Sequence, residues 1–253
     1  MPRNKKNTEQ AVGSQNRTVT PNEAKNALTH CIQLQRPIMM WGAPGIGKSD
    51  IVKQVANNHG REVVDIRLPL WEPTDIKGIP YYNSKENNMV WASPAELPTD
   101  PKSTAIVFLD ELNSAAPAVQ AAAYQLILNR RVGQYHLPEG VSIVAAGNRD
   151  SDKGVTYRMP APLANRFVHI ELRVDFEDWL QWATNEHIHA DVVGYCTFAK
   201  QDLYDFDPRG SSRSFATPRS WSFVSQLLSD DLPESTLTDL VAGCVGEGLA
   251  VKF

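Results

Sequence analysis

One eight-residue stretch, Gly42–Ser49, has the spacing G-x-x-x-x-G-K-S of a phosphate-binding loop. Its glycines let backbone N–H groups converge on phosphate oxygens, and a following helix directs its positive end toward them. Lys48 would reach the terminal phosphates, and the Ser49 hydroxyl would ligate Mg²⁺. Average composition brings the four specified positions together by accident in roughly one per cent of chains of this length, so a glycine turn that binds nothing is a poor explanation.

Two adjacent carboxylates, Asp110 and Glu111, follow the apolar run Ile106–Leu109. In parallel α/β sheets, ligands bind at the carboxyl ends of the strands, which is where this pair would lie. Asp110 would hold hydrated Mg²⁺, while Glu111 would orient and deprotonate an attacking water molecule. The alternative is that both residues only begin the loop to the next helix, and the phosphate loop makes that alternative the weaker one.

Asn148 ends another apolar run, which begins at Val141. Its amide could hydrogen-bond the attacking water or the terminal phosphate. Asn is also a common turn residue at the ends of strands, so its position supports both interpretations equally.

Two arginines could supply further positive charge. Arg166 comes directly before the last apolar run and could reach the nucleotide of a neighbouring subunit as an arginine finger; a surface ion pair is the alternative. Arg219 follows Thr217 and Pro218, an N-cap and a first-turn proline. It therefore lies in the first turn of a helix, where the dipole disfavours a cation. Such a placement suggests an anionic partner, and a γ-phosphate is a candidate.

Alternating strands and helices must position these groups. A capping box at Thr20 predicts a helix to about Gln35, and apolar residues at helical spacing predict further helices around Ile51 and Val119. Strands that alternate with helices indicate an α/β fold with a mainly parallel sheet. The apolar runs that predict buried strands are Ile38–Trp41, Glu62–Leu68, Thr104–Leu109, Val141–Ala146 and Phe167–Leu172.

The chain divides near residue 172, where the strand signals stop. Residues 18–172 are predicted to form an α/β core, and residues 173–253 a small α-helical second domain with proline-punctuated connections. In that domain Trp179 and Trp182 fit a helical core better than a stacking platform. Residues 1–17 are polar and basic, which is typical of a disordered tail.

The composition narrows the function. The net charge of the 253 residues is −4, and the basic tail leaves the remaining body more acidic still, which argues against broad non-specific binding of nucleic acid. Three dispersed cysteines indicate neither a disulfide framework nor a zinc site and fit a reduced, cytoplasmic setting. No apolar run suits a signal peptide or a membrane span, so we expect neither export nor membrane insertion.

Taken together, the motifs resemble those of AAA+ ATPases. Asp110–Gln120 is similar to the D-E-[IL]-N-x-A-x-P-x-V-Q pattern of the MoxR-like, dynein-related branch of that family. The resemblance covers about residues 20–230. The positions similar to the family's Walker A, Walker B, sensor 1, arginine finger and sensor 2 are, in that order, Gly42–Ser49, Asp110 with Glu111, Asn148, Arg166 and Arg219.

The resemblance implies a fold, cofactors and roles. The fold would be that of a P-loop NTPase, with a parallel five-stranded sheet in the order 5-1-4-3-2 between helices and a small α-helical lid. ATP and Mg²⁺ would be the cofactors, and the chain would form a homo-oligomeric, hexameric ring with nucleotide at each interface. The implied catalytic residues are Glu111, Asn148, Arg166 and Lys48; the implied metal ligands are Ser49 and Asp110; the implied nucleotide contacts are Gly42, Ala43, Pro44, Gly45, Ile46, Gly47, Lys48, Ser49, Asp50 and Arg219.

Two segments resemble insertions of the same branch. Residues 70–98, with Tyr81, Tyr82 and Trp91, correspond to its helix-2 insertion, and residues 132–140 to its pre-sensor hairpin. The aromatic side chains suggest contact with a substrate or partner. Packing of these rings across their own hairpin is the alternative.

The implied activity is Mg²⁺-dependent ATP hydrolysis coupled to remodelling or activation of a separate protein, such as one with a von Willebrand factor A domain. Because the sequence ends with the helical domain, we expect any adaptor to be a different chain. One alternative is a nucleotide-switched assembly module with slow turnover, which the two carboxylates make less attractive. The other is a DNA-remodelling protein of helicase-loader or translocase type, against which the acidic body argues.

Overall fold

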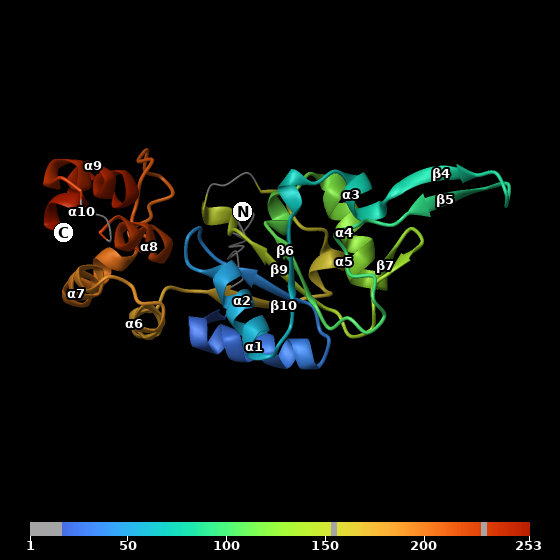
Figure 1. Cartoon of the computed structure of the whole chain (residues 1–253), viewed down its shortest axis with the longest axis horizontal. Helices are drawn as coiled ribbons and strands as arrows, with labels where there is room; N and C mark the ends of the chain where they lie inside the picture. Colours follow the sequence, from blue (N-terminus) through green and yellow to red (C-terminus); the bar gives the residue numbers. More distant parts are fainter. Residues whose placement is uncertain (1–16, 153–155, 229–231) are drawn as a thin grey trace, which may run out of the picture.

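A six-stranded parallel sheet in the order β1-β10-β2-β9-β6-β3 forms the centre of the molecule (Figure 1). The structure is a computed structural model that describes residues 17–152, 156–228 and 232–253. Five strands follow the predicted order 5-1-4-3-2 and confirm the α/β class. The prediction of five strands is one short, because β1 (Thr18–Val19) has too few residues to give a pattern. Residues 1–16 of the predicted tail lie outside the described residues.

The predicted core elements are present, and their ends lie within two residues of the predicted ones. The remaining strands of the sheet are β2 (Ile38–Trp41), β3 (Val63–Arg67), β6 (Ile106–Asp110), β9 (Ser142–Gly147) and β10 (Val168–Leu172). The helices and 3-10 turns of the core are α1 (Pro21–Gln33), α2 (Lys48–Asn58), η1 (Leu68–Leu70), α3 (Pro73–Lys77), η2 (Leu112–Ser114), α4 (Pro117–Asn129), η3 (Asp150–Asp152) and α5 (Ala161–Ala164).

The strands are apolar throughout because both faces of the sheet are covered. Successive side chains of a strand point to opposite faces. In β2, Met39 packs in the same cluster as Val119 of α4, whereas Met40 packs on the other face with Ile51 of α2. Burial on both faces is what gives a parallel strand its continuous apolar run.

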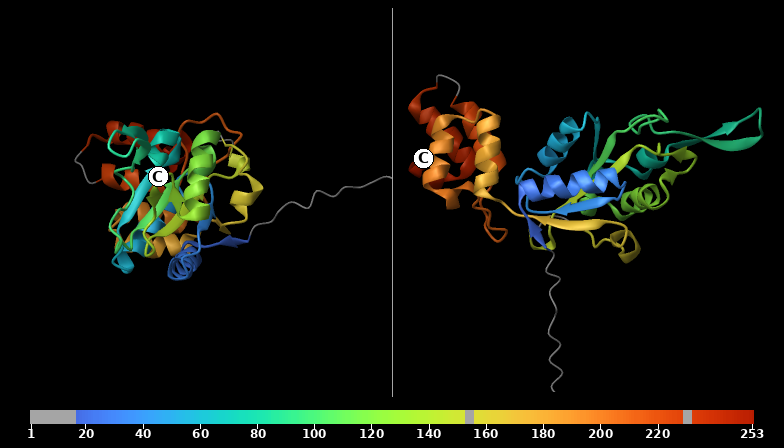
Figure 2. Two further views of the ribbon diagram at one scale, coloured as in Figure 1. Left: turned by 90° about the vertical axis from the view of Figure 1, so that its right-hand side faces the viewer. Right: turned by 90° about the horizontal axis from the view of Figure 1, so that it is seen from below.

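The helices after β10 form a group of their own, which we call the lid. Its core surrounds Trp221, which is fully buried, and includes Trp179. The lid lies at one end of the molecule (Figure 2). In the described residues of the whole chain, no helix is long and apolar enough to cross a membrane. The lid elements are α6 (Phe176–Asn185), α7 (Ala190–Phe198), η4 (Lys200–Leu203), α8 (Pro218–Leu227), α9 (Glu234–Val245) and α10 (Glu247–Lys252).

The start of α1 ties the core to the lid. The predicted capping box is present: Thr20 Oγ1 accepts from Glu23 N at 3.3 Å, and Thr20 N donates to Glu23 Oε2 at 2.9 Å. Such a cap stabilises a helix start by about 1 kcal/mol. Two residues further on, Asn22 donates from its backbone (2.7 Å) and its amide (2.8 Å) to Asp178 of α6. The capped start of α1 therefore hydrogen-bonds to the first lid helix.

Two hairpins lie at the end of the core opposite the lid (Figure 1). β4 (Ile79–Asn83) and β5 (Asn88–Ala92) form a projecting hairpin, and β7 (Arg131–Val132) with β8 (Tyr135–His136) forms a shorter one. Trp91 N donates to Gln134 Oε1 at 3.2 Å, which joins the two hairpins. Tyr81 and Tyr82 are 51% and 62% exposed, so at least half of each residue remains open to solvent, whereas Trp91 is partly buried.

Candidate active site

The predicted phosphate loop joins β2 to α2 at the carboxyl end of β2. Gly45 (φ 75°) and Gly47 (φ 90°) have left-handed backbone conformations that favour glycine. Gly47 is the N-cap of α2 and offers no side chain to cap the helix. The N–H groups in the first turn of α2 are therefore open to an anion, which the helix dipole also attracts.

Lys48 begins α2 and is buried, with 9% of its surface exposed. Its Nζ donates to Gly42 O at 2.7 Å, to Ala43 O at 2.9 Å and to Asn148 Oδ1 at 3.2 Å. Burial lowers the pKa of Lys48 to about 8, against the opposing effect of nearby carboxylates, of which Asp110 has the largest. A bound phosphate would favour the charged ammonium further.

The two predicted metal ligands lie side by side, Ser49 in the first turn of α2 and Asp110 at the end of β6. Ser49 Oγ donates to Asp110 Oδ2 at 3.3 Å, although the residues are 61 positions apart. Mg²⁺ prefers oxygen ligands and often binds through one or two carboxylates together with substrate phosphates. The hydroxyl of Ser49 and the carboxylate of Asp110 fit that donor set.

Glu111 leaves the end of β6 in a left-handed conformation with φ 55°. Its backbone N–H donates to Asp110 Oδ1 at 2.9 Å. A non-glycine residue held in this region costs about 1–3 kcal/mol, and such strain often occurs at functional sites. Because of this turn, the two carboxylates lie in different surroundings. Asp110 is buried and hydrogen-bonded to Ser49, whereas Glu111 is partly exposed.

Asn148 follows β9 and contacts Lys48 through its side chain, so the structure brings the predicted polar strand end to the loop. Its backbone is held by Asn113, a residue to which we assigned no role. Asn113 Nδ2 donates to Asn148 O at 2.8 Å, and Asn148 N donates to Asn113 Oδ1 at 3.2 Å. The sequence signal for Asn113 was its match to the N of the D-E-[IL]-N pattern, which gave the residue no role.

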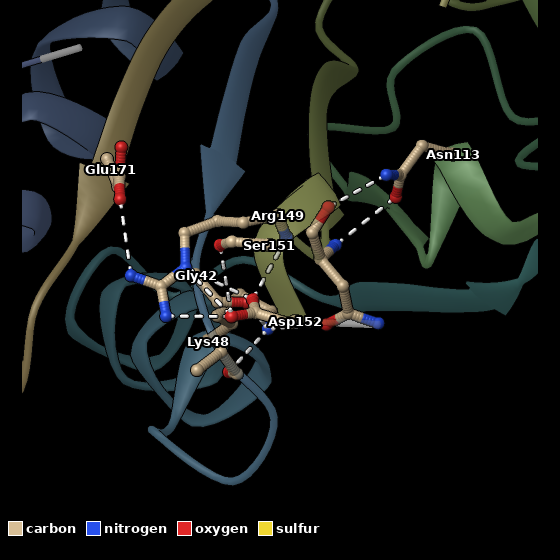
Figure 3. A network of polar contacts seen from close by, with 9 residues as sticks. Gly42, Lys48, Asn113, Arg149, Ser151, Asp152 and Glu171 are labelled. Atoms are coloured by element: carbon tan, nitrogen blue, oxygen red, sulfur yellow. Dashed lines mark hydrogen bonds and ion pairs between the residues drawn. The ribbon is translucent and has the colours of Figure 1, made fainter. Parts of the chain in front are cut away.

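A second group that the sequence did not reveal surrounds Arg149 (Figure 3). Its guanidinium binds Asp152 Oδ1 at 2.8 Å and Glu171 Oε1 on β10 at 3.3 Å. Asp152 is buried and its charge also acts on Lys48. The hydrogen bond with Asp152 raises the pKa of Arg149. In the sequence, Arg149 and Asp152 look like residues of an ordinary polar loop. Their pairing with Glu171 becomes visible only when the fold brings β10 beside that loop.

The two predicted arginines lie in different places. Arg219 is exposed in the first turn of α8, and its backbone N donates to Gly45 O at 3.2 Å. A Cβ atom added at Gly45 would lie 2.7 Å from Thr217 Oγ1, so the lid packs directly on the loop. Arg166 is exposed after α5. Its side chain forms no ion pair with any described residue and does not join the loop of its own chain.

A cleft of about 500 Å³ opens between the loop and the lid. Asp50 and Arg219 line it, together with Trp179, Trp182 and Phe223 from the lid. Both tryptophans therefore serve the lid core and the cleft wall, whereas the sequence favoured the core alone. The cleft is large enough for a small organic ligand. Gly45, Ile46 and Gly47 of the phosphate loop also line it, whereas Lys48 and the strand-end carboxylates do not, so the cleft adjoins the loop on the side away from the two predicted metal ligands.

A parallel sheet, a glycine loop leading into a helix, and an acidic strand end beside that loop define a P-loop nucleotide-binding protein. Residues 37–169 match the model of the ATPase family associated with various cellular activities (AAA). The match covers more than half of the chain, and the protein belongs to this family. The predicted class, an ATPase of AAA+ type, is confirmed.

Relatives of known name agree with this assignment. Over 174 residues, 63% of the chain, it is 30% identical to midasin from Giardia intestinalis; over 166 residues, 59% of the chain, it is 26% identical to midasin from Dictyostelium discoideum. These matches support the predicted MoxR-like, dynein-related branch. The matched region spans only 4% and 3% of the two midasins.

Solved structures share the fold. A mutant form of RuvB from Thermotoga maritima is 16% identical with a TM-score of 0.51, covering 91% of this chain and 67% of RuvB. NtrX from Brucella abortus, in complex with ADP, is 13% identical with a TM-score of 0.51, covering 84% of this chain and 50% of NtrX. At these identities the likeness concerns the fold alone.

Proposed function

We propose that this chain hydrolyses ATP with Mg²⁺ as its metal ion. The observation that carries the proposal is the meeting of Lys48, Ser49, Asp110 and Asn148 at the carboxyl ends of three neighbouring strands, β2, β9 and β6. Glu111 follows Asp110 directly. Membership of an ATPase family supports the same conclusion.

Each side chain has its own task in this reaction. Lys48 exchanges the carbonyl oxygens of Gly42 and Ala43 for phosphate oxygens, and the open N–H groups of α2 bind the same anion. Glu111 orients the attacking water and accepts its proton, while Asn148 hydrogen-bonds that water or the terminal phosphate. When bound at Ser49 and Asp110, Mg²⁺ would neutralise charge on the phosphates.

The base and ribose would occupy the cleft between loop and lid. Its tryptophans supply flat apolar surface, and Asp50 lines it near the loop. Arg219 lines the same cleft, which supports a contact with the nucleotide bound by its own chain. The charge of Arg219 already acts on Lys48, so both cations belong to one electrostatic environment.

The proposed assembly is a hexameric ring of identical subunits. Arg166 supports it, because an exposed arginine without an ion pair in the described residues is free to reach the nucleotide of an adjacent subunit. There it would stabilise the charge that develops during phosphoryl transfer. Residues 18–172 and 173–253 would act as core and lid, and hydrolysis would move one relative to the other.

The proposed cellular role is remodelling or activation of a separate protein in the cytoplasm. A partner with a von Willebrand factor A domain is the candidate that the MoxR-like resemblance favours. Exposed Tyr81 and Tyr82 on the projecting hairpin support a protein contact. The net charge of −4 gives no support to DNA as the substrate.

Substitution Glu111→Gln tests the catalytic proposal. We expect the steady-state rate of ATP hydrolysis to fall roughly a hundred-fold or more, because a general base contributes at least that much. Binding of ATP should persist, since the phosphate loop is unchanged. Exposed Glu96, which forms no ion pair with a described residue, provides the matched control Glu96→Gln, which should hydrolyse normally. An unchanged rate in Glu111→Gln would remove Glu111 from its role.

A further inference from the structure

Asn113 is almost fully buried, with 1% of its surface exposed, and lies in η2 just after Glu111. Both ends of its amide are used on one residue. The nitrogen donates to the carbonyl of Asn148, and the oxygen accepts from the backbone N–H of Asn148. Asn113 therefore pairs with residue 148 as a neighbouring strand would.

This pairing replaces a strand ladder that has ended. The parallel pairing of β6 with β9 stops at Leu109 and Ala145. β6 then leads into the left-handed turn at Glu111, so no backbone pair joins the two strand ends beyond that point. On its other side, β9 continues to pair with β2 as far as Gly147. The Asn113 amide is what ties residue 148 to the side of the sheet that carries Glu111.

Gly147 confirms how closely the two segments approach. A Cβ atom added there would lie 2.5 Å from Asn113 Oδ1 and 2.6 Å from Met39 Cε. A side chain at position 147 would therefore require the Asn113 amide and the end of Met39 to shift. The backbone before Asn148 is therefore packed against the Asn113 amide, and a shift of that amide would shift residue 148.

The side chain of Asn148 lies at the other end of this connection. Its Oδ1 accepts from Lys48 Nζ at 3.2 Å, so a displacement of its backbone moves the amide relative to the loop. Glu111 is attached to Asn113 through Leu112 alone. Asn113 thus links the turn that carries the proposed base with the backbone that carries the proposed sensing amide.

We propose that Asn113 is a positioning residue for hydrolysis: it fixes the backbone of Asn148 and so sets the place of the Asn148 amide relative to Glu111 and Lys48. The inference rests on the proposed ATPase function. A positioning residue acts only through the group it places, so its loss should affect turnover through Asn148 and leave the binding of nucleotide largely unchanged.

The test is a double-mutant comparison of Asn113→Ala, Asn148→Ala and the two together. We expect Asn113→Ala to lower kcat roughly ten- to hundred-fold, as a misplacement of about 1 Å does, and to change the Kd for a non-hydrolysable ATP analogue by less than about three-fold. The double variant should be no slower than Asn148→Ala alone, because the second loss has nothing further to remove.

Asn113→Asp keeps the size of the side chain and the acceptor for Asn148 N–H, but its ionised carboxylate offers no donor to Asn148 O. Its kcat should therefore fall relative to the wild type as pH rises and the carboxyl ionises, which keeps the test valid if the alanine variant unfolds. Gln120 is the matched control: it is another buried amide of the same segment, and its Nε2 donates to Ala115 O at 3.0 Å. Gln120→Ala should lower the melting temperature without a comparable loss of kcat.

Three results would overturn the inference. One is losses in Asn113→Ala and Asn148→Ala that multiply in the double variant, and another is a kcat in Asn113→Asp that equals the wild-type value at every pH. The third is a Kd that rises as much as kcat falls, which is the result of general damage to the site. All three require wild-type hydrolysis and leave the proposed function intact. A wild-type chain that neither binds nor hydrolyses ATP would instead remove the proposed function together with this inference.

Discussion

The inner and outer parts of the site differ in how their polar groups are partnered. Lys48, Asp110 and Asn113 are at most 9% exposed, and each hydrogen-bonds to other groups of the chain. Arg166 and Arg219 are exposed, and neither forms an ion pair with a described residue. The inner part is held in place by the fold, whereas the outer part carries charges that the described chain does not neutralise.

The difference indicates where additional molecules would act. A buried charge must be compensated within the protein, because leaving it unpaired is costly. An exposed cation is solvated by water and needs no partner within the chain. It is therefore available to bind a phosphate or an acidic group of another subunit. The inner residues can therefore be tested in the isolated chain, while Arg166 must be tested in the proposed ring.

The largest effect should come from Arg166→Ala, which removes one of the two exposed cations of the outer part. If Arg166 acts across a subunit interface, its loss should lower kcat about a thousand-fold, as the loss of an arginine finger does. Mixing with Lys48→Ala subunits, which retain Arg166, should restore part of the activity. The measurement is steady-state hydrolysis across mixing ratios, and no recovery at any ratio would contradict an action between subunits.

A smaller effect should appear in the pH dependence of the free energy of unfolding, to which Lys48 contributes. It tests whether the inner part is as strongly desolvated as its burial indicates. Burial lowers the pKa of Lys48 to about 8 from its ordinary value of 10.5. Between these values the unfolded chain binds more protons than the folded one, so this group makes the chain more stable as pH rises from about 8 to 10.5. The full gain is about 3 kcal/mol.

Urea unfolding of the wild type and Lys48→Met without nucleotide, at several pH values in this window, isolates that contribution. The difference in unfolding free energy between the two proteins should change in favour of the wild type as pH rises. A difference that is constant across the window would mean that Lys48 is not desolvated in the folded chain.

The smallest effect should come from Tyr81→Ser on the projecting hairpin. Its ring is 51% exposed, so the substitution should change the unfolding free energy by less than about 0.5 kcal/mol. Tyr135 provides the contrast, because its buried ring donates a hydrogen bond to Pro98 O at 2.6 Å. Tyr135→Phe should cost about 1 kcal/mol. A loss above about 2 kcal/mol in Tyr81→Ser would instead show that the ring stabilises its own hairpin.

The parts of the fold that follow from local signals could be predicted from the sequence. The buried strands come from continuous apolar runs, the start of α1 from the capping box at Thr20, and the phosphate loop from its glycine spacing. Strand β1 gave no signal because two residues establish no period. The roles of the site residues remain predictions, although Lys48, Asp110 and Asn148 lie together as their motifs require.

The polar connections around the site could not be predicted, because each depends on a contact between distant segments. Asn113 meets Asn148 across 35 positions, and Arg149 meets Glu171 across 22. A buried polar side chain looks like any loop residue until the fold supplies its partner. Trp179 packs in the lid core and also lines the cleft. The second contact could not be predicted either, because it depends on how the lid lies against the loop.

The contact between Gly45 and Thr217 has a mechanical consequence. The loop and α8 already touch through Arg219 N and Gly45 O, and there is no clearance for even a methyl group at position 45. If hydrolysis moves the lid as proposed, α8 would be able to move away from the loop but not closer to it along this line. The loop backbone that would hold the nucleotide would then also set the closed limit of the lid's movement.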